Sequence, residues 1–294
     1  MHRFLISLIA LLLCSTQVFA VPYLVVISRT QTLSNPQALA TDYLIRLLEE
    51  RSQGGIHVAL QETSGSPLAV SNQQRMQLAM VSLPETVSKL PQLAFLQLPY
   101  LFRDRQHLYQ FLASEAGRKI FQADRQPDFI PLAVWDLGFY QLITGTTDLP
   151  GELVAADSWQ TFSNMQHNAV PSQDRLLTDL IKEQPQQTRQ LILSNHLLNG
   201  KVLMVSRSFW DATPDDLKII IIGAIKDATL YFRELAQQDE LQSLAALRGT
   251  LTIHNLSPGQ RNDWQIDAQR NYPHPMSSID RQMIDIISNL DPVE

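Results

Sequence analysis

The stretch Tyr23–Leu60, YLVVISRTQTLSNPQALATDYLIRLLEERSQGGIHVAL, decides the fold. It begins with YLVVIS, which is apolar on both faces, as a buried parallel strand is. Asn35 is expected to cap a helix that opens with Pro36. Leucines at helical spacing then follow, until Gly54 and Gly55 stop the helix. IHVAL predicts a second strand. A strand, a helix and a strand so close together form a parallel βαβ unit with a right-handed crossover.

Strands and helices continue to alternate along the chain. A helix is expected near residues 72–78, followed by the strand AMVSL, and KVLMVS (Lys201–Ser206) predicts another strand. Thr213 then supplies an N-cap, with a proline at the first helical position and two carboxylates in the first turn. Apolar residues at helical spacing predict one long helix to Arg248, with Gly249 as its stop, unless the polar stretch 237–240 interrupts it. This pattern predicts an α/β protein, with two lobes.

The first twenty residues predict export. A short basic start precedes the apolar run FLISLIALLLC, and the segment ends in Val18-Phe19-Ala20, a pattern typical of signal-peptidase sites. The run is short for a membrane anchor, so we expect a signal peptide over residues 1–20, cleaved after Ala20, and a periplasmic protein. A retained anchor is the alternative. The only cysteine, Cys14, lies inside this segment, so the mature chain has no thiol for a disulfide or a metal.

Composition and motifs argue against nucleic-acid binding and catalysis. Removing Arg3 from the 23 basic residues leaves 22 against 29 acidic ones, a net charge of −7, which is unsuited to nucleic acid. The sequence contains no Gly-x-Ser-x-Gly, phosphate-binding glycine loop or His-Glu-x-x-His, and its histidines are scattered, so we expect no enzyme, cofactor or metal site. Asp104, Glu115 and Asp136 are interpreted as solvated carboxylates. An exported α/β protein of this kind is most often a binding protein, with its ligand between lobes.

Four stretches, taken in order, carry a family resemblance. They are SNPQALATDYLIRLLEERSQGGIHVAL, LPYLFRDRQHLYQFLASEAGRKI, PLAVWDLGFYQLITG and LILSNHLLNGKVLMVSRSFWDATPDD. Together they resemble the solute receptors of tripartite ATP-independent periplasmic (TRAP) transporters, of the dicarboxylate-receptor type. The resemblance implies a two-lobed periplasmic binding-protein-like α/β fold with parallel and mixed sheets and a long connecting helix. It also implies lobe one at 21–133 plus 198–248, and lobe two at 134–197 plus 249–294.

The resemblance also implies a function. Such receptors are not enzymes; they close on a small organic ligand and deliver it to integral membrane permease subunits. Members of the family usually carry a carboxylate-binding arginine where this chain has Tyr140 in GFYQ. A second arginine, on a strand of lobe two, has no counterpart, so one strand-helix unit of that lobe is expected to be missing. Because a tyrosine offers one neutral donor in place of a guanidinium fork, simple dicarboxylates are expected to bind weakly.

The expected ligand contacts follow from the same resemblance. They are Asn35, Trp135, Tyr140, Gln173 and Arg175, and the ligand is a carboxylate or a neutral molecule. Tyr140 packed between the lobes is an equal alternative. Arg175 could instead be a surface residue paired with Asp174 or Asp179. Two functions stay open: a divergent solute receptor, or an accessory or sensory partner of a membrane protein that binds no small molecule. An exported hydrolase is a more distant third.

Overall fold

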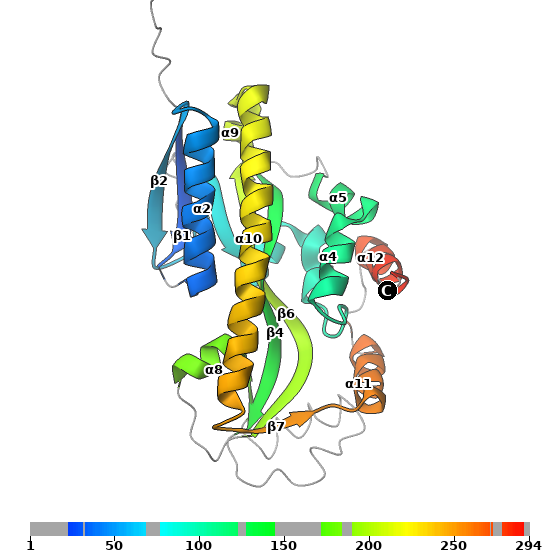
Figure 1. Cartoon of the computed structure of the whole chain (residues 1–294). Helices are drawn as coiled ribbons and strands as arrows, with labels where there is room; N and C mark the ends of the chain where they lie inside the picture. Colours follow the sequence, from blue (N-terminus) through cyan, green and yellow to red (C-terminus); the bar gives the residue numbers. More distant parts are fainter. Residues whose placement is uncertain are drawn as a thin grey trace, which may run out of the picture.

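The protein folds around a mixed β-sheet (Figure 1). A computed structural model describes residues 23–31, 33–68, 77–122, 128–144, 172–183, 190–270, 272 and 278–290. Within them the sheet has seven strands in the order β2-β1-β3-β6-β4-β5, and β7 pairs with β6. The strands are β1 Tyr23–Thr30, β2 Ile56–Thr63, β3 Leu78–Ser82, β4 Phe129–Thr144, β5 Ser172–Arg175, β6 Gln190–Ser206 and β7 Thr252–Asn255.

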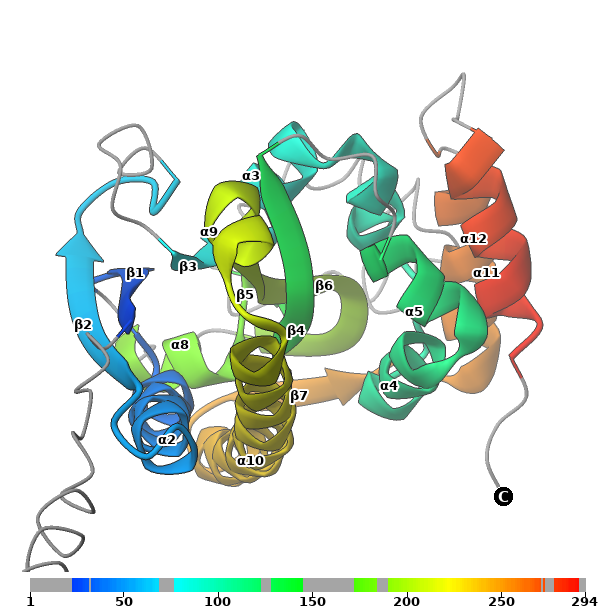
Figure 2. The same ribbon diagram turned by 90° about the horizontal axis from the view of Figure 1, so that it is seen from above.

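Helices cover both faces of the sheet (Figure 2). Buried residues of α2 and α10 pack on one face, and those of α3, η2, α4 and α12 pack on the other. The helices are α2 Asn35–Arg51, α3 Leu83–Lys89, η2 Pro91–Gln97, α4 Arg105–Ala113, α5 Glu115–Gln122, α8 Leu177–Glu183, α9 Arg207–Ala212, α10 Asp215–Leu247, α11 Pro258–Arg270 and α12 Ser278–Ser288. Two hydrophobic cores therefore lie back to back across the sheet.

The predicted βαβ unit is confirmed. β1 and β2 pair in parallel from Tyr23 opposite Ile56 to Thr30 opposite Thr63, with α2 between them in sequence. Buried Leu44 and Leu48 of α2 pack against the same core as the sheet residues beneath them. This unit gives β1 and β2 a common carboxyl end, which lies beside the start of α2 (Figure 1).

Two helix starts differ by one residue from the prediction. The N-cap of α2 is Ser34, not Asn35, because Gln37 then stands at the third helical position and completes a capping box; the Ser34 amide donates to Gln37 Oε1 at 3.0 Å. Asn35 is the first residue of the helix and is exposed. The N-cap of α10 is Pro214, because the hydroxyl of Thr213 donates instead to the carbonyl of Phe209 at 2.7 Å.

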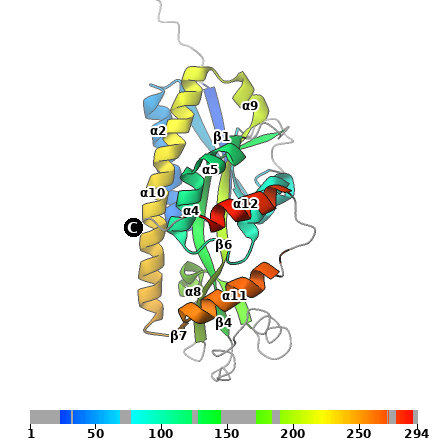
Figure 3. The ribbon, with the colours of Figure 1, turned by 90° about the vertical axis from the view of Figure 1, so that its right-hand side faces the viewer.

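The long helix is confirmed. α10 contains 33 residues, continues through the polar stretch 237–240 and ends at Leu247, next to its C-cap Arg248. At 1.5 Å per residue it is about 50 Å long. It runs along the molecule from α9 and α2 to α8 and β7 (Figure 3).

Two long strands connect the ends of the molecule. β4 has 16 residues and β6 has 17, and they pair antiparallel over most of their length. One end of this ribbon lies beside β3, and the other carries β5 and β7 (Figure 1). Its register shifts between Pro131 and Ala133, between Asp136 and Gly138, and between Tyr140 and Leu142. Such irregularities bend a ribbon and redirect its side chains.

Several predictions fall outside the described residues. They concern the signal peptide at residues 1–20, most of the helix near 72–78, and the segment 145–171, where a unit of lobe two was expected to be missing. Leu78 itself is the first residue of β3, so the predicted helix does not reach it. Among the helices that the structure describes, none combines the length and the apolar character that crossing a membrane requires.

A buried histidine fastens α12 to α4. His107 Nε2 donates to the carbonyl of Ile287 at 2.9 Å, and the amide of Arg103 donates to Nδ1 at 3.2 Å, so the ring is neutral. Burial lowers the pKa of His107, and the charge of Arg103 adds to the decrease. Protonation would replace the Nδ1 acceptor with a second N–H facing a backbone donor.

This histidine predicts a loss of stability in acid. Its folded pKa lies below the unfolded value of about 6.5, so the unfolded state binds the proton first. Its contribution to stability is therefore complete above pH of about 6.5 and decreases as the pH falls through the folded pKa. Unfolding midpoints measured from pH 7.5 to 5 should fall less steeply for His107→Gln than for the parent. Exposed His57→Gln is the control, and equal slopes for parent and His107→Gln would contradict the assignment.

Candidate functional site

Two of the predicted contact residues come together where β4 meets β5. In the antiparallel pairing of β4 and β5, Gln141 lies opposite Arg175. Tyr140 directly precedes Gln141 in β4. Tyr140 is half-buried. Burial raises the pKa of its hydroxyl, and the charges of Asp179 and Asp174 add to the increase, while Arg175 opposes it. The phenol is therefore a neutral donor among charges of mostly negative sign.

Arg175 is bound by its own segment. Its Nε lies 2.8 Å from Oε1 of Glu183, and its Nη1 donates to the backbone carbonyl of Asp174 at 3.0 Å. The ion pair seen is therefore with Glu183, rather than with the carboxylate of Asp174 or Asp179. Gln173, the other predicted residue of this strand, pairs through its backbone with Ile143. The cation is positioned beside Tyr140, but its charge is already partly balanced.

A histidine links β5 to β6 and to the LPYLF turn. His196 is 3% exposed; its Nε2 lies 3.3 Å from Asp174 Oδ1, and its Nδ1 lies 2.8 Å from Ser194 Oγ. The hydrogen bond from His196 lowers the pKa of Asp174. The amide of Tyr100 donates to the carbonyl of His196 at 2.7 Å, and the two rings lie 6.5 Å apart. This contact holds the LPYLF turn against β6, the strand whose Leu197 pairs with Tyr140.

The other two predicted residues lie elsewhere. Trp135 is 0% exposed, its ring stacks on Phe232 at 4.8 Å, and its Nε1–H donates to Thr229 Oγ1 at 2.9 Å. The indole is thus enclosed by α10 and presents no surface to a solute in this conformation. Asn35 is exposed at the start of α2, beside the carboxyl end of β1. The structure therefore joins Tyr140 and Arg175, and separates both from Trp135 and Asn35.

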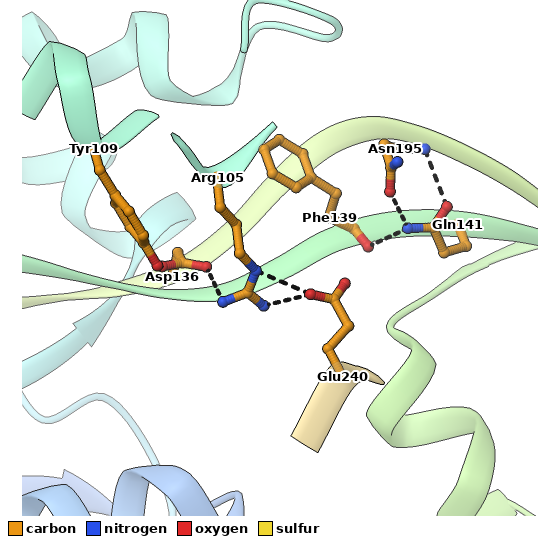
Figure 4. A network of polar contacts seen from close by, with 7 residues as sticks. All are labelled: Arg105, Tyr109, Asp136, Phe139, Gln141, Asn195 and Glu240. Atoms are coloured by element: carbon orange, nitrogen blue, oxygen red, sulfur yellow. Dashed lines mark hydrogen bonds and ion pairs between the residues drawn. The ribbon is translucent and has the colours of Figure 1, made fainter. Parts of the chain in front are cut away.

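A buried ion-pair network crosses the middle of the ribbon (Figure 4). Asp136, interpreted above as solvated, is 0% exposed: Arg105 Nη1 lies 2.7 Å from its Oδ1, and the hydroxyl of Tyr109 donates to its Oδ2. Arg105 also pairs with Glu240 of α10, Nη2 to Oε2 2.8 Å. Burial alone would lower the pKa of Arg105, but the charges of Asp136 and Glu240 outweigh it and raise the pKa. Arg233 lies over the ring of Tyr109 at 3.9 Å.

The solvated interpretation of Asp136 failed for a physical reason. The side chain projects from the central part of β4, where α4 and α10 enclose it. A sequence signal existed, because a carboxylate inside the apolar run of WDLGFYQ needs a buried partner. The other two acids are different: Asp104 caps α4 and Glu115 forms an exposed pair with Lys119.

Two residues next to this network adopt left-handed backbone conformations. Gly138 has φ +105, and a Cβ there would lie 3.1 Å from Arg105 Nη2 and 3.2 Å from Glu240 Oε1. On β6, Asn195 has φ 46, its amide donates to Gln141 Oε1 at 3.0 Å, and Gln141 Nε2 donates back to its side chain (Figure 4). Both strands are therefore distorted close to Tyr140.

These features define a class of protein. A mixed sheet with helices on both faces, a long ribbon shared by its two ends and a helix along its length form the frame of a two-lobed extracytoplasmic solute receptor. The chain matches the family described as "Bacterial extracellular solute-binding protein, family 7" over residues 27–150 and 160–278. It belongs to that family, which contains the solute-binding receptors of TRAP transporters.

Known relatives agree with this assignment. The "C4-dicarboxylate-binding periplasmic protein DctP" of Rhodobacter capsulatus is 22% identical over 286 residues, covering 85% of this chain and 86% of the relative. A TRAP periplasmic solute-binding protein from Sulfurospirillum deleyianum, solved with bound succinate, has a TM-score of 0.70 at 24% identity, covering 92% of this chain and all of that one. Another from Polaromonas, bound to D-erythronate, has a TM-score of 0.72 at 16% identity over 92% of this chain and 100% of that one. The predicted fold class is confirmed.

Proposed function

We propose that the mature chain, cleaved after Ala20, is a periplasmic receptor that captures a small organic solute between its two lobes. It would pass the solute to integral membrane permease subunits and perform no chemistry on it. The observation that carries this proposal is the family match, which includes the whole connecting ribbon and the long helix. We place the lobe boundaries as predicted, at 21–133 plus 198–248 and 134–197 plus 249–294. The family match also supports a receptor over an accessory or sensory partner that binds no solute.

The described residues support specific roles for the predicted contacts. Tyr140 is half-buried and protonated, so it can donate one hydrogen bond to a hydroxyl or carboxylate of the solute. Arg175 lies beside it and can donate a second hydrogen bond, although its guanidinium also forms an ion pair with Glu183. Gln173 and Asn35 complete the polar set from β5 and from α2. Trp135 acts as a positioning residue, because it packs the ribbon against α10.

A thermal-shift screen of the mature protein tests the proposal. The library should contain small organic acids, sugars and amino acids, and at least one solute should raise the unfolding midpoint in a saturable way. A ligand at 100 times its Kd adds about 2.7 kcal/mol to the free energy of unfolding, an easily measured shift. Tyr140→Phe should reduce the shift, while Tyr23→Phe, which alters an exposed tyrosine of β1, should not. A library that stabilises neither parent nor variants would favour the accessory role instead.

A further inference from the structure

Polar side chains gather at the carboxyl end of β1 and the strands beside it. Arg29 and Thr30 are the last two residues of β1, and Ser82 is the last residue of β3. Lys201 of β6 pairs with Ser82, and its Nζ donates to Thr30 Oγ1 at 2.7 Å. This end of the sheet points toward α8 and the part of the ribbon that carries Tyr140 (Figure 1). Ligands of α/β proteins bind beyond the carboxyl ends of their strands.

The two cations at this edge are largely buried, and the guanidinium of Arg29 is incompletely paired. The Arg29 side chain is 14% exposed, and its Nη2 lies 2.8 Å from Oε1 of Glu62. Its Nε and Nη1 are buried and meet no acceptor among the described residues. Lys201 is 9% exposed, and burial together with the charge of Arg29 lowers its pKa. The only carboxylate paired with either cation among the described residues is Glu62, which pairs with Arg29 and is itself half-exposed.

A third donor lies over the same edge. Gln37, in the first turn of α2, is 2% exposed, and its Nε2 has no acceptor within the described residues. One turn later, Thr41 contacts the sulfur of Met80, two residues before the end of β3. α2 connects the parallel strands β1 and β2, and β3 is parallel to β1, so α2 and β3 run in opposite directions. Gln37 precedes Thr41 by one helical turn and therefore lies toward the end of β3, where Ser82 pairs with Lys201. The first turn of α2 carries no acidic residue to occupy these donors.

Leaving buried charged donors without acceptors is costly. An unsatisfied buried polar group costs about 1–3 kcal/mol, and more when it is charged. Two neighbouring cations add repulsion to that cost. A structural role would be better served by a second carboxylate, and no second acidic side chain is paired with Arg29 or Lys201 in the part of the chain described. The arrangement is therefore suited to an anion that enters from outside.

The opposite lobe constrains the rest of such a ligand. Between Arg125 and Arg175 the sequence contains no lysine or arginine. Arg175 pairs with Glu183, and the carboxylates of Asp174 and Asp179 lie close enough to raise the pKa of Tyr140. A second carboxylate near Tyr140 would meet this negative charge, whereas a hydroxyl could accept from or donate to the phenol.

We propose that Arg29, Lys201 and the Gln37 amide form an anion-binding site that holds the carboxylate of a small hydroxylated monocarboxylic acid. The hydroxyls of the solute face Tyr140. This inference rests on the proposed receptor function and narrows its substrate class. It also explains how a chain without the expected second-lobe arginines can hold an acid: the compensating charge stands in the first lobe.

Calorimetric titration with matched acids and neutral compounds tests the site. The probes are D-erythronate and D-glucuronate, their neutral counterparts erythritol and D-glucose, and succinate. At least one hydroxy acid should bind with a saturable heat, its neutral counterpart should not, and succinate should bind more weakly. Lys201→Met and Arg29→Gln should each weaken the acid at least tenfold. Exposed Lys226→Met and Arg46→Gln are the matched controls and should bind like the parent.

Folding of the variants is checked by their unfolding midpoints without ligand. Lys201→Met removes a repulsion from a buried site, so the unfolding midpoint should not fall. If Lys201 had a purely structural role, the substitution should lower the midpoint. If Lys201→Met fails to fold, Arg29→Gln still decides the question. Acid binding that survives both substitutions, or binding of neutral solutes only, would overturn the anion site while leaving the receptor function intact. An absence of binding by every solute, including the wider screen, would overturn both.

Discussion

Replacing Asp136 by alanine is expected to lower the free energy of unfolding by about 3–5 kcal/mol, the usual cost of breaking a buried ion pair from one side. The carboxylate is 0% exposed, forms an ion pair with Arg105 and accepts a hydrogen bond from the hydroxyl of Tyr109. Its removal leaves a buried guanidinium with Glu240 alone and a buried phenol without its acceptor. Since total stability is commonly about 5–15 kcal/mol, denaturant unfolding should show a large loss.

Two further variants separate charge from packing. Asp136→Asn keeps the shape and can still accept from Tyr109, so it should lose less than Asp136→Ala. Glu115→Gln removes an exposed carboxylate of the Glu115–Lys119 pair and should leave the unfolding midpoint unchanged. An Asp136→Ala protein as stable as the parent would show that the network of Figure 4 does not hold α4 and α10 to the ribbon.

Trp135→Ala is the second large expected effect, with a loss of about 3–5 kcal/mol. The indole is fully buried, stacks on Phe232 of α10 and donates to Thr229, so alanine would leave a cavity and an orphaned hydroxyl. Trp135→Phe should retain most of the stacking and lose only part of this stability. Ile219→Ala is the control, because Ile219 is 72% exposed and its truncation should cost no more than about 0.5 kcal/mol.

The same variant bears on function. If Trp135 positions the ribbon and does not contact the solute, Trp135→Phe should bind the preferred acid with an affinity close to that of the parent. A large loss of affinity in a stable Trp135→Phe protein would instead make the indole a ligand contact. Unfolding and titration of one preparation distinguish these outcomes.

Local sequence patterns were sufficient to predict most of the helices and strands. The βαβ unit followed from apolar strands and helical spacing, and α10 followed from its carboxylates, its period and Gly249. The helix starts were off by one residue because Ser34 and Pro214 had to be compared with their neighbours as alternative caps. The residue that becomes the N-cap depends on which of the neighbouring side chains forms the capping hydrogen bond.

The site was less predictable because its parts are far apart in sequence. Lys201 and Thr30 are 171 positions apart, and Arg29 is one position further from Lys201. Arg29 and Lys201 come together only because β3 pairs with both β1 and β6. Tyr140 and Arg175 were found through a resemblance, which pointed to the second lobe as the place for cations. The buried polar partners of Asp136 likewise come from α4 and α10, and no local pattern specifies them.

The central claim is that a small acid binds between the two lobes and draws them together. The only cysteine lies within the first twenty residues, so spin labels can be placed at Asp42→Cys on α2 and Lys182→Cys on α8 without background. Pulsed electron-electron double resonance then measures the distance between the labels, with and without saturating D-erythronate or D-glucuronate. The account predicts a shorter and narrower distance distribution with the acid that binds, and no change with erythritol or D-glucose. A distribution that no acid alters would contradict it.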